Sequence, residues 1–344
     1  MPDSFVLIGQ ILLLVTSCAA AQQPAEAPYD GPGVRYPGGD GPGAGKHVVL
    51  VAGDEEYRSE EALPMLARIL AVRHGFRCTV LFSTDPETGA IDPDRRDHLP
   101  GLAALDDADM LVLFTRFREL PDEDMAHLVR YVESGKPLLG IRTATHAFHY
   151  PAESTSAYAH WRWNDREWPG GFGKQVLGET WVNHHGHHGS ESTRGVIPAA
   201  AKDHPILRGV ADVWGRTDVY GIGELPKDAT VLLEGSVLAG MTPDAQPVED
   251  GRNDPRHPIL WVRERKMDSG ATQRVICSTI GAAIDLKSED LRRALVNACY
   301  WGMGMEDRIP AKSAADTVGG YDPTDFGFGA ARKGVMPAEH ALRE

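Results

Sequence analysis

Short, almost wholly apolar segments alternate with amphipathic stretches through the first part of the chain. The apolar segments, each typical of a strand buried on both faces of a parallel sheet, are residues 47–53, 76–82, 110–114 and 138–141. The stretches between them repeat apolar residues every three or four positions, which predicts helices packed on the sheet. This alternation predicts an α/β fold, a doubly wound and mostly parallel sheet with helices on both faces.

Two helices in this region have recognisable boundaries. Ser59 is the expected N-cap of the first, whereas Asp122 begins the second and Gly135 closes it. The apolar positions expected to face the sheet are Leu63, Leu66, Ile69 and Leu70 in the first helix, and Met125, Leu128, Val129 and Val132 in the second.

The pattern changes after residue 150, where shorter apolar segments are separated by longer polar ones. We expect short strands at residues 176–181, 218–221, 230–233, 259–263 and 274–278, and a closing helix at residues 291–301. Residues 46–305 are therefore expected to form one domain. Residues 306–344 have no periodic pattern, and we expect them to form an irregular tail that wraps the domain.

The N-terminal residues carry a separate signal. The apolar segment at residues 5–15, followed by small residues, is typical of a secretory signal peptide spanning residues 1–21. Either the peptide is simply cleaved, or Cys18 ends a lipobox and becomes a lipid-anchored N-terminus. Residues 22–45 are rich in Pro, Gly and Ala and predict a flexible leader. The mature protein is expected to be periplasmic, lipid-anchored or extracellular, without a membrane-spanning segment.

Composition narrows the range of partners. Hydrophobic residues make up 42% and charged residues 24% of the chain, which is ordinary for a soluble globular protein. The formal net charge of −14 argues against nucleic acids and anionic membranes, because both require a basic patch. Cys78, Cys277 and Cys299 are widely spaced among apolar residues, and we expect buried thiols rather than a disulfide framework.

The segment Gly140-Ile141-Arg142-Thr143-Ala144-Thr145-His146 follows an expected strand. A sharp strand-to-helix turn carries the nucleophile in class I glutamine amidotransferases and, in a related form, in α/β-hydrolases. In the amidotransferases this turn contains Gly-x-Cys-x-Gly, whereas Arg142 stands at the Cys position here. A guanidinium is permanently protonated and cannot attack a carbonyl, so we expect no glutaminase activity. The chain also lacks the Gly-x-Ser-x-Gly turn of serine hydrolases and a phosphate-binding loop.

Several other segments of the sequence are informative when considered together with this turn. They are residues 49–53, Glu56-Tyr57-Arg58-Ser59, His184-His185-Gly186-His187-His188, His204-Pro205-Ile206-Leu207, Asp218-Val219-Tyr220, residues 274–282 and residues 294–301. Together they resemble the ThuA-like (trehalose utilisation protein-like) family, whose fold is that of the class I glutamine amidotransferases (flavodoxin-like). The resemblance covers residues 47–305 and implies a part in the catabolism of disaccharides or oxidised glycosides. Many family members have Gly-His where this chain has Gly281-Ala282.

The histidine-rich segment is a candidate metal site. Neutral imidazole is the commonest metal ligand in proteins, and Zn²⁺ takes three or four ligands. The candidate ligands are His184, His185, His187 and His188, with an oxygen from Glu56, Glu179 or Asp218. Zinc or another divalent metal would fit such a set. The alternative is a polar loop whose histidines bond to substrate or to backbone.

Further candidates flank the ends of the expected strands. His146 and Glu56 follow two of these strands and are candidate general acids or bases. Arg142 either binds an anionic or sugar oxygen or is a structural arginine paired with a buried acid. Tyr57 and Arg58 are expected to bind substrate, although Glu56 and Arg58 could instead form a surface ion pair.

Aromatic residues suggest how a sugar would be held. Trp161, Trp163 and Trp168 lie close together in the sequence, and either stack on a sugar or close a small core. We take Trp163 and Tyr220 as substrate-binding candidates. The leading hypothesis is a carbohydrate-processing hydrolase, lyase or isomerase in which Glu56, Arg142, His146 and the histidine segment share one crevice. The rival hypothesis is a non-catalytic carbohydrate-binding protein on the same scaffold.

Overall fold

Five parallel strands form the centre of the domain. The computed structural model describes residue 1 and residues 31–342, so the predicted signal peptide lies almost wholly outside the described residues. The parallel strands run in the order β3 (Arg77–Phe82), β2 (His47–Gly53), β4 (Met110–Thr115), β5 (Leu138–Ile141) and β12 (Thr272–Ser278). Because strand order reverses at β2, the predicted doubly wound α/β arrangement is confirmed.

Antiparallel strands extend the sheet at both edges. Strand β1 (Val34–Tyr36) pairs with β3 at one edge. The other edge continues through β11 (His257–Lys266), β10 (Ala229–Leu238), β7 (Ser192–Val196) and β8 (Trp214–Gly215). Strands β6 (Trp181–His184) and β9 (Tyr220–Ile222) form a separate pair. Since β1 lies within residues 22–45, the expectation of a flexible leader is wrong for residues 34–36, where Tyr36 is fully buried.

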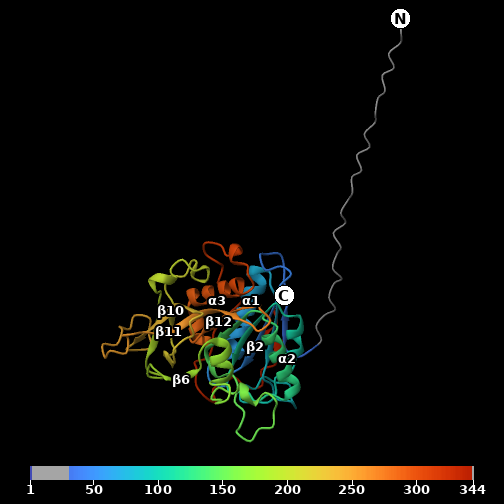
Figure 1. Cartoon of the computed structure of the whole chain (residues 1–344), viewed down its shortest axis with the longest axis horizontal. Coiled ribbons are helices and arrows are strands. Elements are labelled where there is room, and N and C mark those ends of the chain that lie inside the picture. Colours follow the sequence, from blue (N-terminus) through green and yellow to red (C-terminus); the bar gives the residue numbers. More distant parts are fainter. Residues whose placement is uncertain (2–30, 343–344) are drawn as a thin grey trace. The chain divides into compact units, whose positions relative to one another are not determined.

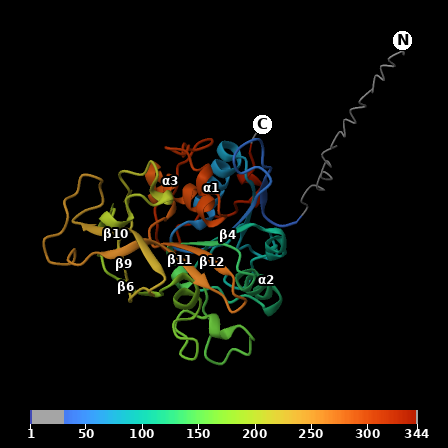
Figure 2. The same cartoon turned by 45° about the horizontal axis from the view of Figure 1, so that its top comes forward.

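Helices cover both faces of the sheet. Helices α1 (Ser59–His74) and α3 (Glu289–Gly302) pack on one face, and α2 (Asp122–Glu133) packs on the other (Figures 1 and 2). The apolar positions predicted for α1 and α2 are all buried. The three cysteines are free and buried, as expected.

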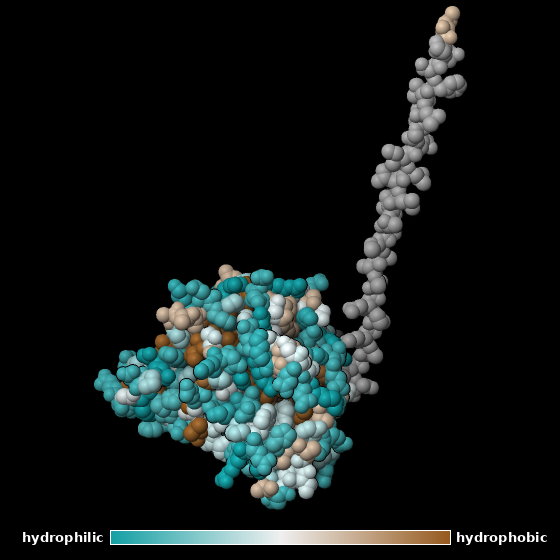
Figure 3. Space-filling model, viewed as in Figure 1, coloured by the Kyte–Doolittle hydropathy of each residue, from teal (hydrophilic) through white to brown (hydrophobic). Residues whose placement is uncertain are grey.

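The structure also has short helical turns between the main strands and helices and in the tail. They are Leu102–Asp107, Arg142–His146, Ala159–Trp161, Gly173–Leu177, Ala199–Ala201, Pro205–Leu207, Ala283–Lys287, Glu306–Arg308 and Pro337–His340. No helix among the described residues is long and apolar enough to span a membrane. The face shown in Figure 3 is largely hydrophilic, with apolar residues scattered over it.

Two local expectations fail. Residues 176–180 do not form a strand, and β6 begins only at Trp181. Val176 and Leu177 are instead buried from the helical turn Gly173–Leu177, and Gly178 ends that turn with φ 115°. Ser59 is not the N-cap of α1. Arg58 takes that position with φ 61°, and the Ser59 hydroxyl instead accepts the Asp54 N–H at 3.0 Å.

The tail beyond α3 is bound to the domain along its length. His74 contacts the carbonyl of Ala314 at 2.8 Å, and the Tyr36 hydroxyl donates to the carbonyl of His340 at 2.7 Å. Between these points, Arg58 donates to the carbonyl of Gly327 at 2.6 Å. The contact between Arg58 and Gly327 brings the tail to the carboxyl end of β2.

Candidate functional site

A pocket of about 350 Å³ opens at the carboxyl ends of the parallel strands. Ligands of open α/β sheets bind at this edge, where strand order reverses. Glu56 reaches the pocket from the loop after β2, and His146 from the turn after β5. The complete lining is Glu56, Arg116, His146, Trp181, His184, His188, Tyr220 and Phe328. Glu56, His146 and two of the four candidate histidines therefore meet in one crevice.

The turn after β5 keeps the backbone of a nucleophile elbow. Arg142 has φ 48°, a left-handed conformation that is uncommon for a residue other than glycine. Conformations of this kind cost about 1–3 kcal/mol and persist where the surrounding structure enforces them. The backbone of this turn therefore has the strained conformation of the elbow, while the residue at its centre is an arginine.

The Arg142 guanidinium lies wholly inside the protein beneath the pocket. One terminal nitrogen donates to the carbonyls of Asp218 and Thr279 at 2.8 and 2.7 Å, and the other donates to Asp218 Oδ1 at 3.0 Å. The guanidinium carbon also lies 3.6 Å from the Tyr220 ring centroid and 4.5 Å from that of Tyr57. Because its donors face inward, Arg142 is a structural arginine paired with a buried acid and does not line the pocket.

Asp218 connects this arginine to the histidines. Its Oδ2 lies 2.7 Å from His184 Nδ1, and its Oδ1 lies 3.1 Å from His188 Nδ1. Burial opposes ionisation, yet the Arg142 charge and the two histidine hydrogen bonds hold the Asp218 pKa well below its usual range. An ionised carboxylate can only accept, so both Nδ1 atoms donate and both Nε2 atoms stay available for other partners.

Glu56 is the carboxylate that reaches the pocket. Its Oε1 lies 3.3 Å from His188 Nε2, and its Oε2 lies 3.4 Å from Arg116 Nε. Burial raises the pKa of Glu56, while the charges of Arg116 and His188 oppose that shift. The backbone around it is fixed, because Asp54 Oδ1 accepts the Glu56 N–H at 2.7 Å. Contacts therefore run in sequence from Glu56 through His188 and Asp218 to Arg142.

His146 lies deeper in the wall of the pocket. Its Nδ1 is 3.1 Å from Thr145 Oγ1, and its ring centroid lies 5.0 Å from that of Phe117 and 5.2 Å from that of Trp181. Burial, together with the charges of Arg116 and Arg142, lowers the pKa of His146 well below its ordinary value. The imidazole is therefore neutral at physiological pH and can take part in hydrogen bonds as an uncharged group.

His185 and His187 do not belong to this cluster. His185 Nε2 donates to the Arg252 carbonyl at 2.8 Å, and its ring lies against that of His257, tilted by 52° with 4.2 Å between centroids. The His187 side chain is 73% exposed and lies 3.3 Å from Glu191. The strand β6 ends at His184, and the following turn directs these two side chains away from the pocket. The expected four-histidine metal set is therefore corrected to His184 and His188.

Several other candidates lie behind the pocket instead of in its wall. Arg58 is fully buried and donates to the backbone carbonyls of Glu55 and Glu56, so a surface ion pair with Glu56 is wrong. Tyr57 is buried against Arg142, with its hydroxyl 3.3 Å from a guanidinium nitrogen.

The tryptophans and Glu179 also lie outside the lining. The Trp163 ring packs 5.9 Å from that of Trp181, and Trp161 is part of the core. Glu179 is bound by Lys174 at 3.0 Å. Of the candidate sugar-binding aromatics, Tyr220 alone lines the pocket among the described residues.

A buried carboxylate network beside the pocket escaped the sequence analysis. Glu55 accepts from Arg96, Arg116 and Arg118 at 3.1, 2.6 and 2.7 Å. The acidic run after β2 was visible in the sequence, but its partners lie 41, 61 and 63 residues further along. This network fixes Arg116 in the pocket wall. Phe328, from the aperiodic tail, was missed as well.

His184, His188 and Asp218 are also the group that could hold a metal ion among the described residues. One ligand atom from each lies within 4.8 Å of the others. Both Asp218 oxygens are already hydrogen-bonded, which is typical of a carboxylate that orients metal-binding histidines from behind. These residues therefore offer two histidine ligands backed by Asp218, and a bound Zn²⁺ would take its remaining ligands from water or substrate.

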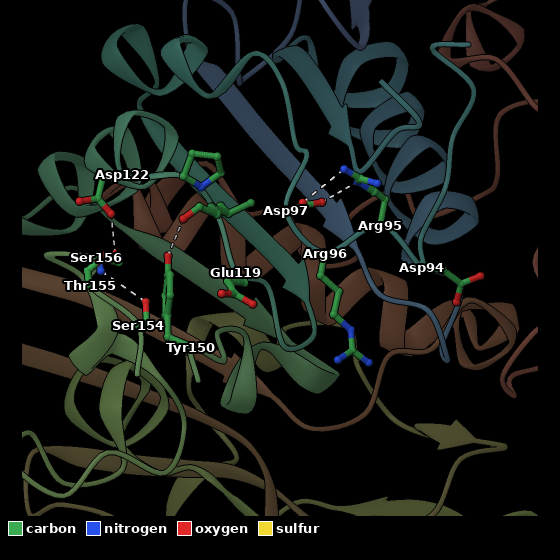
Figure 4. A pocket seen from close by; sticks show the side chains of 12 residues that line it. Asp94, Arg95, Arg96, Asp97, Glu119, Asp122, Tyr150, Ser154, Thr155 and Ser156 are labelled. Atoms are coloured by element: carbon green, nitrogen blue, oxygen red, sulfur yellow. Dashed lines mark hydrogen bonds and ion pairs between the residues drawn. The ribbon is translucent and has the colours of Figure 1, made fainter. Parts of the chain in front are cut away.

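A larger and more open groove of about 700 Å³ holds none of the predicted site residues (Figure 4). Its side chains are largely engaged with one another. Ser156 donates to Asp122 at 2.5 Å, Tyr150 donates to the Leu120 carbonyl at 3.0 Å, and Arg95 pairs with Asp97 (Figure 4). The smaller pocket is lined by Glu56 and His146, two buried groups whose pKa values burial shifts, so we assign the functional site there.

Comparisons with known proteins concern the fold and the family. A crystal structure of a ThuA-like protein from Parabacteroides merdae is similar with TM-score 0.46 and 13% identity, covering 75% of this chain and 90% of that one. The glutaminase domain of CTPS from Trypanosoma brucei with bound acivicin is similar with TM-score 0.36 and 8% identity, covering 79% and 99%. No curated protein matches in sequence. The ThuA family model, described as trehalose utilisation, matches residues 48–302, and the chain therefore belongs to the ThuA family.

Proposed function

We propose that this protein is an exported carbohydrate-processing enzyme that works by acid–base chemistry in the Glu56 pocket. The observation that carries the proposal is the 3.3 Å contact between Glu56 and His188, with Asp218 bonded to the far side of that imidazole. A buried carboxyl with a raised pKa, next to an oriented imidazole, suits proton transfer near neutral pH. Family membership supports a sugar substrate, and the apolar segment 5–15 supports export.

The residues in the pocket favour elimination or isomerisation over conventional glycoside hydrolysis. Most glycosidases use two carboxyl groups that flank the scissile bond, about 5–9.5 Å apart. Among the described residues, Glu56 is the one carboxylate in the pocket lining. A single base suffices to remove a proton from a sugar carbon next to a carbonyl group. We therefore propose an oxidised glycoside as substrate. Glu56 removes the proton from the carbon next to the carbonyl, the bond between the neighbouring carbon and the glycosidic oxygen breaks as a C=C bond forms, and Glu56 returns the proton to that oxygen, while neutral His146 binds a sugar oxygen.

A divalent metal would complement this chemistry. His184 and His188 would hold it through Nε2, with Asp218 orienting both rings. When bound, such an ion polarises a carbonyl oxygen and makes the neighbouring carbon more acidic. The protein's own contribution is then to hold the sugar, to orient both imidazoles and to move the proton at Glu56.

Measuring turnover of candidate sugars tests this proposed function. Purified protein, before and after treatment with a chelator and after addition of Zn²⁺, is incubated with glucose disaccharides and with their keto derivatives. Products are followed by NMR, and bound metal is measured by elemental analysis. We expect consumption of a keto derivative, with the metal retained by wild type and lost from His184→Ala. Binding of these sugars without any consumption would reject the enzyme and favour the rival carbohydrate-binding protein.

A further inference from the structure

We propose that Phe328, from the tail outside the ThuA match, is a specificity-determining residue that packs against the second ring of a two-ring glycoside. This inference rests on the proposed function of the pocket and deepens it. The family model ends at residue 302, yet Phe328 lines the pocket together with residues of the domain. The pocket of this chain therefore has one wall that the matched domain does not supply.

The tail segment Thr324–Phe328 is fixed at this position by buried groups. Arg58 donates to Thr324 Oγ1 at 3.1 Å and to the Gly327 carbonyl at 2.6 Å. The Gly327 N–H donates to the Glu56 carbonyl at 2.8 Å, so the tail is bonded directly to the backbone of the proposed base. Gly327 has φ 132°, a conformation that glycine adopts without strain.

The two aromatic side chains of this segment behave differently. The Phe326 ring stacks on Tyr57 at 5.8 Å and lies 5.1 Å from His188, so it is engaged with the domain. Phe328 is 63% exposed although its backbone is held in place. Its ring faces the Arg116 guanidinium at 5.0 Å from the centroid, and Glu55 fixes that guanidinium in turn.

An exposed aromatic ring on an anchored backbone beside a guanidinium is suited to a sugar. The C–H face of a pyranose packs on the aromatic ring, while the guanidinium donates to its hydroxyl groups. Glu56 and His146 lie deeper in the pocket, with relative exposures of 4% and 3%. The reacting ring would therefore occupy the inner part, and the second ring would contact Phe328 at the mouth.

The experiment measures calorimetric dissociation constants of trehalose, as a two-ring probe, and glucose, as a one-ring probe. The proteins compared are wild type, Phe328→Ala and Phe328→Trp, with Met336→Ala as an exposed tail control. We expect Phe328→Ala to weaken trehalose binding about five- to tenfold, the scale of one aromatic contact, and to change glucose binding less than twofold. Phe328→Trp, which keeps an aromatic face, should restore most of the trehalose affinity that Phe328→Ala loses. Met336→Ala should bind both sugars like wild type.

Equal affinities of wild type and Phe328→Ala for trehalose would overturn the role of Phe328, and so would equal weakening for both sugars. If wild type bound neither sugar and consumed no keto glycoside, the proposed carbohydrate function would fall as well. The two failures are therefore distinguishable. Melting temperatures of all variants should match that of wild type, because the exposed ring contributes little to the core.

Discussion

Replacing Glu60 by Gln should stabilise the protein, and by more at neutral than at acidic pH. Glu60 lies in the first turn of α1, is only 7% exposed, and borders a cavity of about 410 Å³ beneath the tail. Neither carboxyl oxygen has a hydrogen-bond partner in another described residue. Burial raises the Glu60 pKa from 4.5 to about 8, with Arg58 opposing and Glu61 and Asp54 assisting that shift.

The direction of this change of stability with pH follows from proton linkage. Because the folded state holds the Glu60 proton more tightly than the unfolded state, stability falls as pH rises from about 4.5 to about 8 and is constant above that. At 1.36 kcal/mol per pKa unit, the cost is about 1 kcal/mol at pH 5 and about 3 kcal/mol at pH 7. Glutamine does not titrate, so its advantage should grow by about 2 kcal/mol between these pH values.

Urea unfolding followed by tryptophan fluorescence at pH 5 and pH 7 measures this difference. Glu61→Gln is the matched control on the same turn of α1. The Glu61 carboxylate accepts the Thr324 N–H at 2.7 Å and its hydroxyl at 2.9 Å, so that variant should lose stability at both pH values. A Glu60→Gln effect that is the same at pH 5 and pH 7 would refute the assignment of Glu60 as a buried neutral acid.

Three further outcomes are expected. Asp218→Asn should lower the free energy of unfolding by about 3–5 kcal/mol in urea titrations, because it leaves the buried Arg142 charge unpaired; a loss below about 1 kcal/mol would contradict that pairing. No ammonia should be released from glutamine, since Arg142 occupies the nucleophile position, and thiol-sensitive release would show otherwise. His188→Ala should abolish turnover of the keto glycoside, whereas His187→Ala should retain at least half of the wild-type rate. Equal losses in the two variants would contradict the conclusion that His188, and not His187, belongs to the site.

The central sheet was predictable because its strands are buried on both faces. A strand with two buried faces leaves a continuous apolar run, so the runs at residues 47–53 and 138–141 coincide with β2 and β5. The run at residues 176–181 misled the prediction for a related reason. Val176 and Leu177 are apolar because a helical turn buries them, and a short apolar run does not distinguish the two states.

The part of the site formed by residues that follow the parallel strands could be predicted from the sequence. Glu56 and His146 follow parallel strands, whose carboxyl ends meet at one edge of the sheet. The contributions of Arg116 and Phe328 depend on long-range contacts with Glu55 and with the tail, for which the sequence has no periodic signal. The sequence allows two roles for Arg142, and the burial of its side chain against Asp218 decides between them.

The most direct test of the proposed chemistry is the rate of keto-glycoside consumption by Glu56→Gln relative to wild type at neutral pH. Gln keeps the shape of the side chain but cannot accept a proton from carbon. Loss of a positioned general base typically lowers the rate about 10²–10⁴-fold, and we predict a loss of that size in kcat with the fold intact. A Glu56→Gln enzyme that retained more than a third of the wild-type kcat would contradict the proposal that Glu56 is the base.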